Sequence, residues 1–174
     1  MLAYNGPRRM EEAYYGYLQA EFFTIGFLKI SGKLVRMGFY RSLKDLEREI
    51  SKHRPTPSLN LEAFEDLLRD LESYLSGRRV SFDHPFQLRG TSFQKKVLKT
   101  VKRIPYGAAR SYKWVAELVG RPRAYRAVAN ILARNPLALI IPCHRVIRED
   151  GRIAGSGFGR RVREYLLRLE GAIG

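Results

Sequence analysis

The single cysteine of the 174-residue chain, Cys143, follows a proline and stands directly before a histidine. A lone cysteine is more often a small buried apolar residue than a reactive one. Here His144, Arg145 and Arg148 follow closely, and positive charge favours the thiolate, which is the nucleophilic form. One cysteine cannot form an internal disulfide and supplies only one soft metal ligand. The sequence therefore predicts a nucleophilic cysteine and no metal.

A cysteine nucleophile needs a base, and the base needs an orienting acid. Adjacent side chains point in different directions, so we expect His144 to reach the Cys143 sulfur through a water molecule. The last predicted helix carries Glu170 one turn beyond Leu166, at the edge of its apolar face, where a carboxylate needs a polar partner. A surface glutamate near a C-terminus is the plainer interpretation of Glu170.

The basic charge is concentrated in the second half of the chain. The chain has 32 Lys and Arg against 17 Asp and Glu, a formal net charge of +15. Residues 1–88 hold 13 basic and 12 acidic side chains, and residues 89–174 hold 19 and 5, which gives net charges of +1 and +14. This asymmetry predicts that the second half binds nucleic acid, although a need for solubility or attraction to an anionic membrane surface would also produce it.

The first half is predicted to be α+β. Residues 22–30 and 33–40 are rich in β-branched and aromatic side chains and flank a Ser31-Gly32 turn, which predicts a hairpin. Apolar spacing predicts a short helix around residues 43–50 and a longer one over 61–75. Asn60 is the expected N-cap of the longer helix, and Gly77 follows its end.

A linker is predicted between two domains. A short strand is expected over residues 79–82, followed by a linker over 83–90. We therefore expect two domains, an α+β domain over residues 1–88 and a basic, nucleic-acid-binding domain over residues 89–174.

The second half is predicted to be mostly helical. Thr91 and Gln94 fit a capping box at the start of one helix. Two closely spaced helices follow, the first from Ser111 to Gly120 and the second over 123–134, whose basic outer face is typical of a helix-turn-helix. An ordinary solvated face is the alternative. Residues 137–141 form an apolar run too short for a typical helix, and we expect a buried, strand-like segment that brings Cys143 to the edge of the core.

The residues around Cys143 resemble a known family. Ile141-Pro-Cys-His-Arg-Val146 is similar to the active-site signature of the O6-alkylguanine-DNA alkyltransferases, or methylated-DNA–protein-cysteine methyltransferases. Further motifs match in order and spacing between residues 88 and 171: Gly90-Thr-Ser-Phe-Gln94, Ile104-Pro-Tyr-Gly107, Ser111-Tyr112, Arg126-Ala-Val128, Asn135-Pro136 and Leu166-Leu-Arg-Leu-Glu-Gly171. The resemblance implies an α+β N-terminal domain followed by a mostly helical C-terminal domain with a winged-helix-like helix-turn-helix. It also implies a supporting role for residues 1–88 and places DNA binding and alkyl transfer in residues 89–174.

The resemblance also implies a reaction. Cys143 would displace guanine from the alkyl carbon on O6 and keep the alkyl group as a thioether, so the protein would act once in DNA repair. His144 would take the thiol proton through water, Glu170 would orient the histidine, and Asn135 would brace the surrounding turn. No cofactor is implied, and the zinc of some family members needs cysteines that this chain lacks.

The implied partner is double-stranded DNA that carries O6-alkylguanine, with the helix-turn-helix in the minor groove. Arg126 would fill the gap left by the flipped base, and Tyr112 would lie near the phosphate and the base of the target nucleotide. Lys113, Arg121 and Arg123 would hold backbone phosphates. No membrane partner is expected, because no apolar run approaches the roughly 20 residues of a membrane span. Since residues 1–10 also lack a secretory signal, we expect a cytoplasmic protein. We further expect a monomer, with cooperative binding along DNA left open.

One segment departs from the family pattern. The expected lesion pocket contains Val146, Ser156 and Gly157, but family members usually carry a tyrosine and a serine where this chain has Ser156 and Gly157, and a glycine where it has Phe158. Loss of the phenol donor would cost about 1–3 kcal/mol of transition-state stabilisation. The alternative is that Ser156 opens the pocket to bulkier alkyl groups or other lesions.

Two further functions remain open from the sequence. A non-catalytic alkylation-lesion sensor would have an unreactive Cys143 but would still prefer damaged DNA. A helix-turn-helix transcription regulator would prefer one DNA sequence over another.

Overall fold

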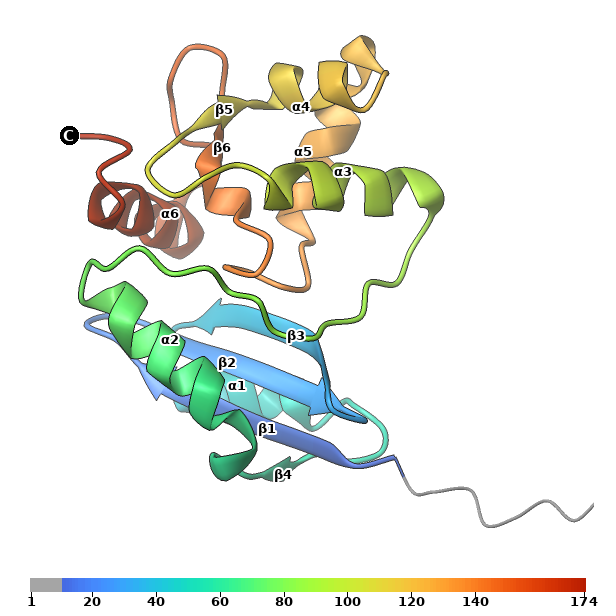
Figure 1. The fold of residues 1–174 in the computed structure, drawn as a ribbon, viewed down its shortest axis with the longest axis vertical. Coiled ribbons are helices and arrows are strands. Elements are labelled where there is room, and N and C mark those ends of the chain that lie inside the picture. Colours follow the sequence, from blue (N-terminus) through green and yellow to red (C-terminus); the bar gives the residue numbers. More distant parts are fainter. Residues whose placement is uncertain (1–10) are drawn as a thin grey trace, which may run out of the picture.

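A computed structural model describes residues 11–174 (Figure 1). Residues 1–10, where the sequence shows no secretory signal, lie outside the described part. Within residues 11–174 no helix is both long enough and apolar enough to cross a bilayer.

The first half is built on a four-stranded sheet of order β3-β2-β1-β4. Its strands are β1 (Ala13–Gln19), β2 (Thr24–Ile30), β3 (Lys33–Tyr40) and β4 (Ser58–Leu59). The predicted hairpin is confirmed, because β2 and β3 pair antiparallel around Ser31 and Gly32, which have φ values of +49° and +77°. The strands β1 and β4 had no counterpart in the sequence prediction.

Helices α1 (Leu43–Ile50) and α2 (Glu65–Leu75) cover opposite faces of this sheet (Figure 1). Alternate residues of β2 face each helix: Leu28 packs with Leu46 of α1, whereas Phe27 belongs to the core that α2 covers. Gly26 lies on the α1 face, and a Cβ at that position would overlap the Leu46 side chain. The absence of a side chain at Gly26 therefore allows α1 to pack directly on β2.

The segment after α2 differs from its prediction. Residues 79–82 form no strand, although Phe82 is buried. The edge of β3 is instead bonded to the predicted linker: Leu34 N donates to Pro85 O at 2.8 Å, and Gln87 N donates to Leu34 O at 2.9 Å. Since these bonds occupy the sheet edge, residues 79–82 have no strand to pair with there.

The second half is mostly helical, as predicted. Thr91 and Gln94 make the capping box of α3 (Ser92–Lys102). The helix-turn-helix consists of α4 (Tyr112–Leu118) and α5 (Tyr125–Ala133), and a 3-10 turn replaces the expected start of the second helix at residue 123. The remaining elements are a 3-10 turn, two short parallel strands and a last helix: Cys143–Arg145, β5 (Arg110–Ser111), β6 (Val146–Ile147) and α6 (Gly157–Leu169).

The segment 137–141 is buried, as predicted, but it forms a turn rather than a strand. Ile141 N donates to Leu137 O at 2.8 Å, and Leu139 has a φ of +67°. The same segment is joined to the sheet, because Met37 N donates to Pro136 O at 2.8 Å and Ala138 N donates to Met37 O at 2.9 Å. One apolar core therefore runs through both halves, from Phe27 to Leu166. The division into two domains at residue 88 remains a prediction.

We expect the replacement Met37→Ala to destabilise both halves together. Met37 is fully buried where β3 meets the 137–141 turn, and such a truncation costs about 2–5 kcal/mol of unfolding free energy. Leu59→Ala is the matched control, since Leu59 is 52% exposed and its loss should cost less than about 0.5 kcal/mol. The test is denaturant unfolding followed by two probes, one in each half of the chain. A shift of the unfolding midpoint in only one half would contradict this expectation.

Candidate active site

Cys143 begins a 3-10 turn directly after the buried Pro142. Its backbone N donates to Ile141 O at 2.8 Å, which fixes the start of the turn. The Cys143 side chain is half-buried, whereas His144 and Arg145 are buried. The expectation that the apolar segment brings the cysteine to the edge of the core is therefore confirmed.

Asn135 holds the chain immediately before Cys143. Its side-chain Nδ2 donates to Ile141 O at 2.8 Å, and its Oδ1 accepts from Leu137 N at 3.0 Å. The one amide thus bonds both ends of the 137–141 turn. This geometry suits the bracing role assigned to Asn135, which itself stays a prediction.

Glu170, at the C-terminal end of α6, is the most highly bonded side chain of the site. Its side chain has no exposed surface, so the surface interpretation of Glu170 is wrong. Three groups donate to Oε1: Tyr74 Oη at 2.6 Å, His144 Nε2 at 2.7 Å and Arg145 Nη2 at 3.0 Å. Two groups donate to Oε2: Arg145 Nε at 2.8 Å and Gly107 N at 3.3 Å. The carboxylate therefore joins α2, the cysteine turn and α6.

These contacts decide the protonation of the pair formed by Glu170 and His144. Burial by itself raises the pKa of Glu170, but hydrogen bonds from His144 and Arg145 outweigh it and bring the pKa down to about 2. Burial lowers the pKa of His144, and the attraction of Glu170 does not reverse this. An ionised carboxylate only accepts, so the neutral His144 carries its proton on Nε2 and leaves Nδ1 free to accept one.

The structure corrects the role expected of Arg145. The Arg145 guanidinium was expected to favour the Cys143 thiolate by its positive charge. It donates instead to Glu170 and, through Nη1, to Ile104 O at 2.7 Å. Arg148 is exposed and lies 4.0 Å from Asp150. Within residues 11–174 no hydrogen bond joins the Cys143 sulfur to His144, whose Nε2 is bonded to Glu170. The expected route between Cys143 and His144 through a water molecule stays a prediction.

Tyr74 is the site residue that the sequence analysis missed. It lies in α2 of the first half, 96 residues before Glu170, and is fully buried. It shares an apolar face with Leu67 and Leu71 at helical spacing. A phenol on such a face needs a hydrogen-bond partner, which the sequence signals, but the spacing does not say which partner it is.

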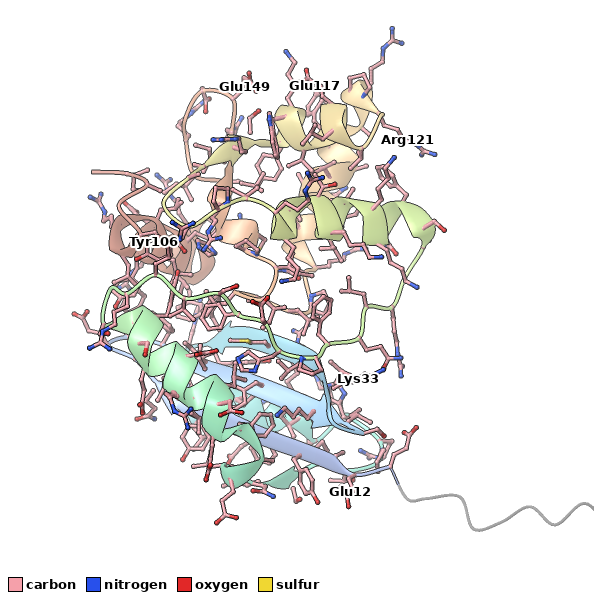
Figure 2. All side chains as sticks on the ribbon, in the orientation of Figure 1. Glu12, Lys33, Tyr106, Glu117, Arg121 and Glu149 are labelled. Atoms are coloured by element: carbon pink, nitrogen blue, oxygen red, sulfur yellow. The ribbon has the colours of Figure 1, made fainter. Side chains whose placement is uncertain are left out.

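The structure gathers three of the predicted DNA-binding residues around one cavity. Tyr112, Lys113 and Arg126 line a cavity of about 610 Å³ between the helix-turn-helix and the loop after β6, together with Tyr125, Ala129, Arg148, Glu149, Asp150 and Ala154. Arg121 and Arg123 are exposed outside this lining, and the Arg121 guanidinium lies 4.7 Å from the centre of the Phe93 ring. Figure 2 shows Arg121 and Glu149 both in the helical half, away from the sheet.

The predicted lesion-pocket residues are not gathered in this way. Val146 is buried in β6, whereas Ser156 and Gly157 are exposed where α6 begins, and none of the three lines the 610 Å³ cavity. Phe158, which departs from the family pattern, is half-buried with the Arg41 guanidinium 5.6 Å from its ring centre. The departure thus places an aromatic ring against the first half of the chain.

The lowered pKa values predict that the folded protein becomes less stable as the pH decreases. Folded His144 resists protonation, so below pH 6.5 unfolding takes up a proton and becomes easier. The pKa of Glu170 is lowered from 4.5 to about 2, and its contribution, about 3 kcal/mol, is present above pH 4.5 and lost toward pH 2.

The free energy of unfolding, measured from pH 7.5 to 3, tests both parts. His144→Gln keeps a donor for Glu170 but has no titrating ring, so its stability should not fall between pH 7 and 5.5. An equal fall in the two proteins over that range would show that His144 is not the group responsible.

Comparisons with known proteins extend over both halves. The family model described as "6-O-methylguanine DNA methyltransferase, DNA binding domain" matches residues 92–172. The methylated-DNA–protein-cysteine methyltransferase of Methanosarcina barkeri is 44% identical over 143 residues, which cover 80% of this chain and 90% of the relative. The constitutive methylated-DNA–protein-cysteine methyltransferase of Bacillus subtilis is 38% identical over 121 residues, covering 69% and 70%.

Solved structures agree with the sequence relatives. The O6-methylguanine methyltransferase of Mycobacterium tuberculosis matches with a TM-score of 0.79 at 32% identity, covering 92% of this chain and 93% of that one. The M. tuberculosis OGT in complex with DNA matches with a TM-score of 0.78 at 33% identity, covering 91% and 93%. The predicted fold class, α+β followed by a helical part with a helix-turn-helix, is thereby confirmed. The chain belongs to the methylated-DNA–protein-cysteine methyltransferase family.

Proposed function

We propose that this protein repairs DNA by moving the alkyl group from O6 of guanine, chiefly a methyl group, onto its own Cys143. The observation that carries the proposal is the 2.7 Å bond from His144 Nε2 to the buried, ionised Glu170, beside a half-buried cysteine. The relatives' names, methylated-DNA–protein-cysteine methyltransferase, support the same reaction.

In the proposed reaction the Cys143 thiol proton passes through a water molecule to His144 Nδ1. The thiolate then attacks the alkyl carbon, so that the carbon–sulfur bond forms as the carbon–O6 bond breaks. The electron pair of the broken bond goes to guanine, which regains a proton. Asn135 keeps the turn in place, and Glu170 keeps His144 in the accepting tautomer. Because a thioether does not hydrolyse readily, each molecule acts once, and no cofactor takes part.

The proposed partner is double-stranded DNA that carries O6-alkylguanine. The support is the net charge of +14 on residues 89–174 and the cavity lined by Tyr112, Lys113 and Arg126. Arg126, exposed on α5, would replace the flipped base, while Arg121 and Arg123 would hold phosphates.

Further parts of the proposal rest on the family pattern alone. Val146, Ser156 and Gly157 would contact the damaged base, and Ser156 would leave more room for the alkyl group than a tyrosine. We also propose a monomer in the cytoplasm.

The test is the intact mass of the protein after incubation with a duplex that carries one O6-methylguanine. We expect a gain of one methylene in the wild type, saturating at one per chain, and no gain in Cys143→Ala. No gain together with tighter binding to the damaged duplex would overturn the proposal in favour of a lesion sensor. No gain and no preference for damage, but preference for one DNA sequence, would favour a transcription regulator.

A further inference from the structure

Tyr74 reaches the candidate active site from the first half of the chain, whereas Cys143, His144 and Glu170 all lie in the second half. Its Oη lies 2.6 Å from Glu170 Oε1, the same oxygen that accepts from His144 Nε2 at 2.7 Å. We infer that Tyr74 is a positioning residue for alkyl transfer, which controls through Glu170 how strongly the carboxylate holds the proton of His144. The inference rests on the proposed function.

Tyr74 is the donor in its hydrogen bond to Glu170. The carboxylate has no proton to give, so the phenol must donate. Burial, followed by the charge of Glu170, raises the pKa of Tyr74, which therefore keeps its proton wherever the protein is folded. A donor on Oε1 draws negative charge from the oxygen that faces His144, and less charge remains there to stabilise a protonated imidazole.

The phenol of Tyr74 is fixed in place. The side chain is fully buried, with edge-to-face contacts to Phe82 at 5.5 Å and to Tyr106 at 6.1 Å between ring centres. Phenylalanine would keep these ring contacts and remove only the hydroxyl group. The replacement Tyr74→Phe therefore isolates the hydrogen bond to Glu170.

A simpler possibility is that Tyr74 packs the core and its hydroxyl bonds to the nearest acceptor. Tyr106 provides the comparison, because its ring centre lies 6.1 Å from that of Tyr74. Figure 2 shows Tyr106 where the two halves meet. The Tyr106 hydroxyl oxygen lies 3.2 Å from the backbone carbonyl oxygens of both Gly77 and Leu169. The hydroxyl donates to these carbonyls and not to the carboxylate of Glu170. A packing role predicts the same behaviour for the two phenylalanine variants, whereas a positioning role predicts different pH profiles.

Removal of the Tyr74 hydroxyl group should raise the pKa of His144, because more of the charge on Oε1 then favours the protonated imidazole. The charged and titratable groups that face this pair come from α2, the loop after α3, the cysteine turn and α6: Tyr74, Tyr106, Arg145 and Arg163. Both arginines oppose protonation of His144, and neither is altered by the substitution. The expected change is therefore a loss of the neutral base at a higher pH.

The experiment measures the single-turnover rate of methyl transfer to the full-length protein, with protein in saturating excess over the damaged duplex, from pH 5 to 8.5. In Tyr74→Phe the acid limb of the rate should move up by about one pH unit, which makes transfer about tenfold slower below the midpoint. The rate at high pH should change much less. In Tyr106→Phe the acid limb should stay at the wild-type midpoint.

Replacement of Tyr74 by 3,5-difluorotyrosine gives the opposite test. The ring keeps its shape while the hydroxyl becomes a stronger donor, so the acid limb should move to lower pH. This variant decides the question should Tyr74→Phe fail to fold. Coincident profiles for the wild type and whichever Tyr74 variant folds would overturn the inference, as would equal shifts in Tyr74→Phe and Tyr106→Phe. A wild type that transfers no methyl group would instead overturn the proposed function.

Discussion

A carboxylate without exposed surface is tolerated only where its charge is balanced and both oxygens accept hydrogen bonds. Glu170 meets this requirement with donors from α2, the loop after α3 and the cysteine turn, while it is itself held by α6. Arg145 balances the charge, so His144 can stay neutral beside an ionised partner. That combination fixes the imidazole tautomer and leaves a proton acceptor one residue from Cys143. In the proposed mechanism, the chemistry of Cys143 therefore depends on how completely the hydrogen-bonding capacity of Glu170 is satisfied.

The same requirement joins the two halves of the molecule. Tyr74 reaches Glu170 from α2, and Met37 of β3 exchanges backbone hydrogen bonds with residues 136 and 138 just before the cysteine turn. The first half carries almost no net charge and no cysteine, yet it supplies a hydrogen-bond donor to Glu170 and a sheet edge that holds the segment before Cys143. Support for the active site is thus a specific set of contacts rather than general packing.

Local patterns in the sequence were sufficient for the elements that local chemistry determines. The capping box at Thr91, the turn at Ser31 and the helical apolar spacing each predicted an element that the structure contains. Strand β1 was not predicted because its sequence shows no alternation of apolar and polar residues. Its three tyrosines are all half-buried. The strand expected over 79–82 failed because pairing depends on a free edge, which a short pattern cannot reveal.

The candidate site divides in the same way. Cys143, His144, Asn135 and Glu170 stand in motifs, so their types and order were readable from the sequence. The partner of Tyr74 was not, because it lies 96 residues away and the contact exists only once α2 and α6 share a core. The sequence also showed that Arg145 is close to Cys143 along the chain, but it did not show where the Arg145 side chain points. In the structure the guanidinium donates to Glu170.

The measurement that tests this account most directly is made on Glu170→Gln, for both unfolding and methyl transfer. Glu164→Gln is the control, because Glu164 forms a half-exposed pair with Arg168. The account predicts that Glu170→Gln loses about 3–5 kcal/mol of stability, since Arg145 becomes a buried charge without a partner, and that methyl transfer is lost with it. A Glu170→Gln protein as stable as the control and as fast as the wild type would contradict the account.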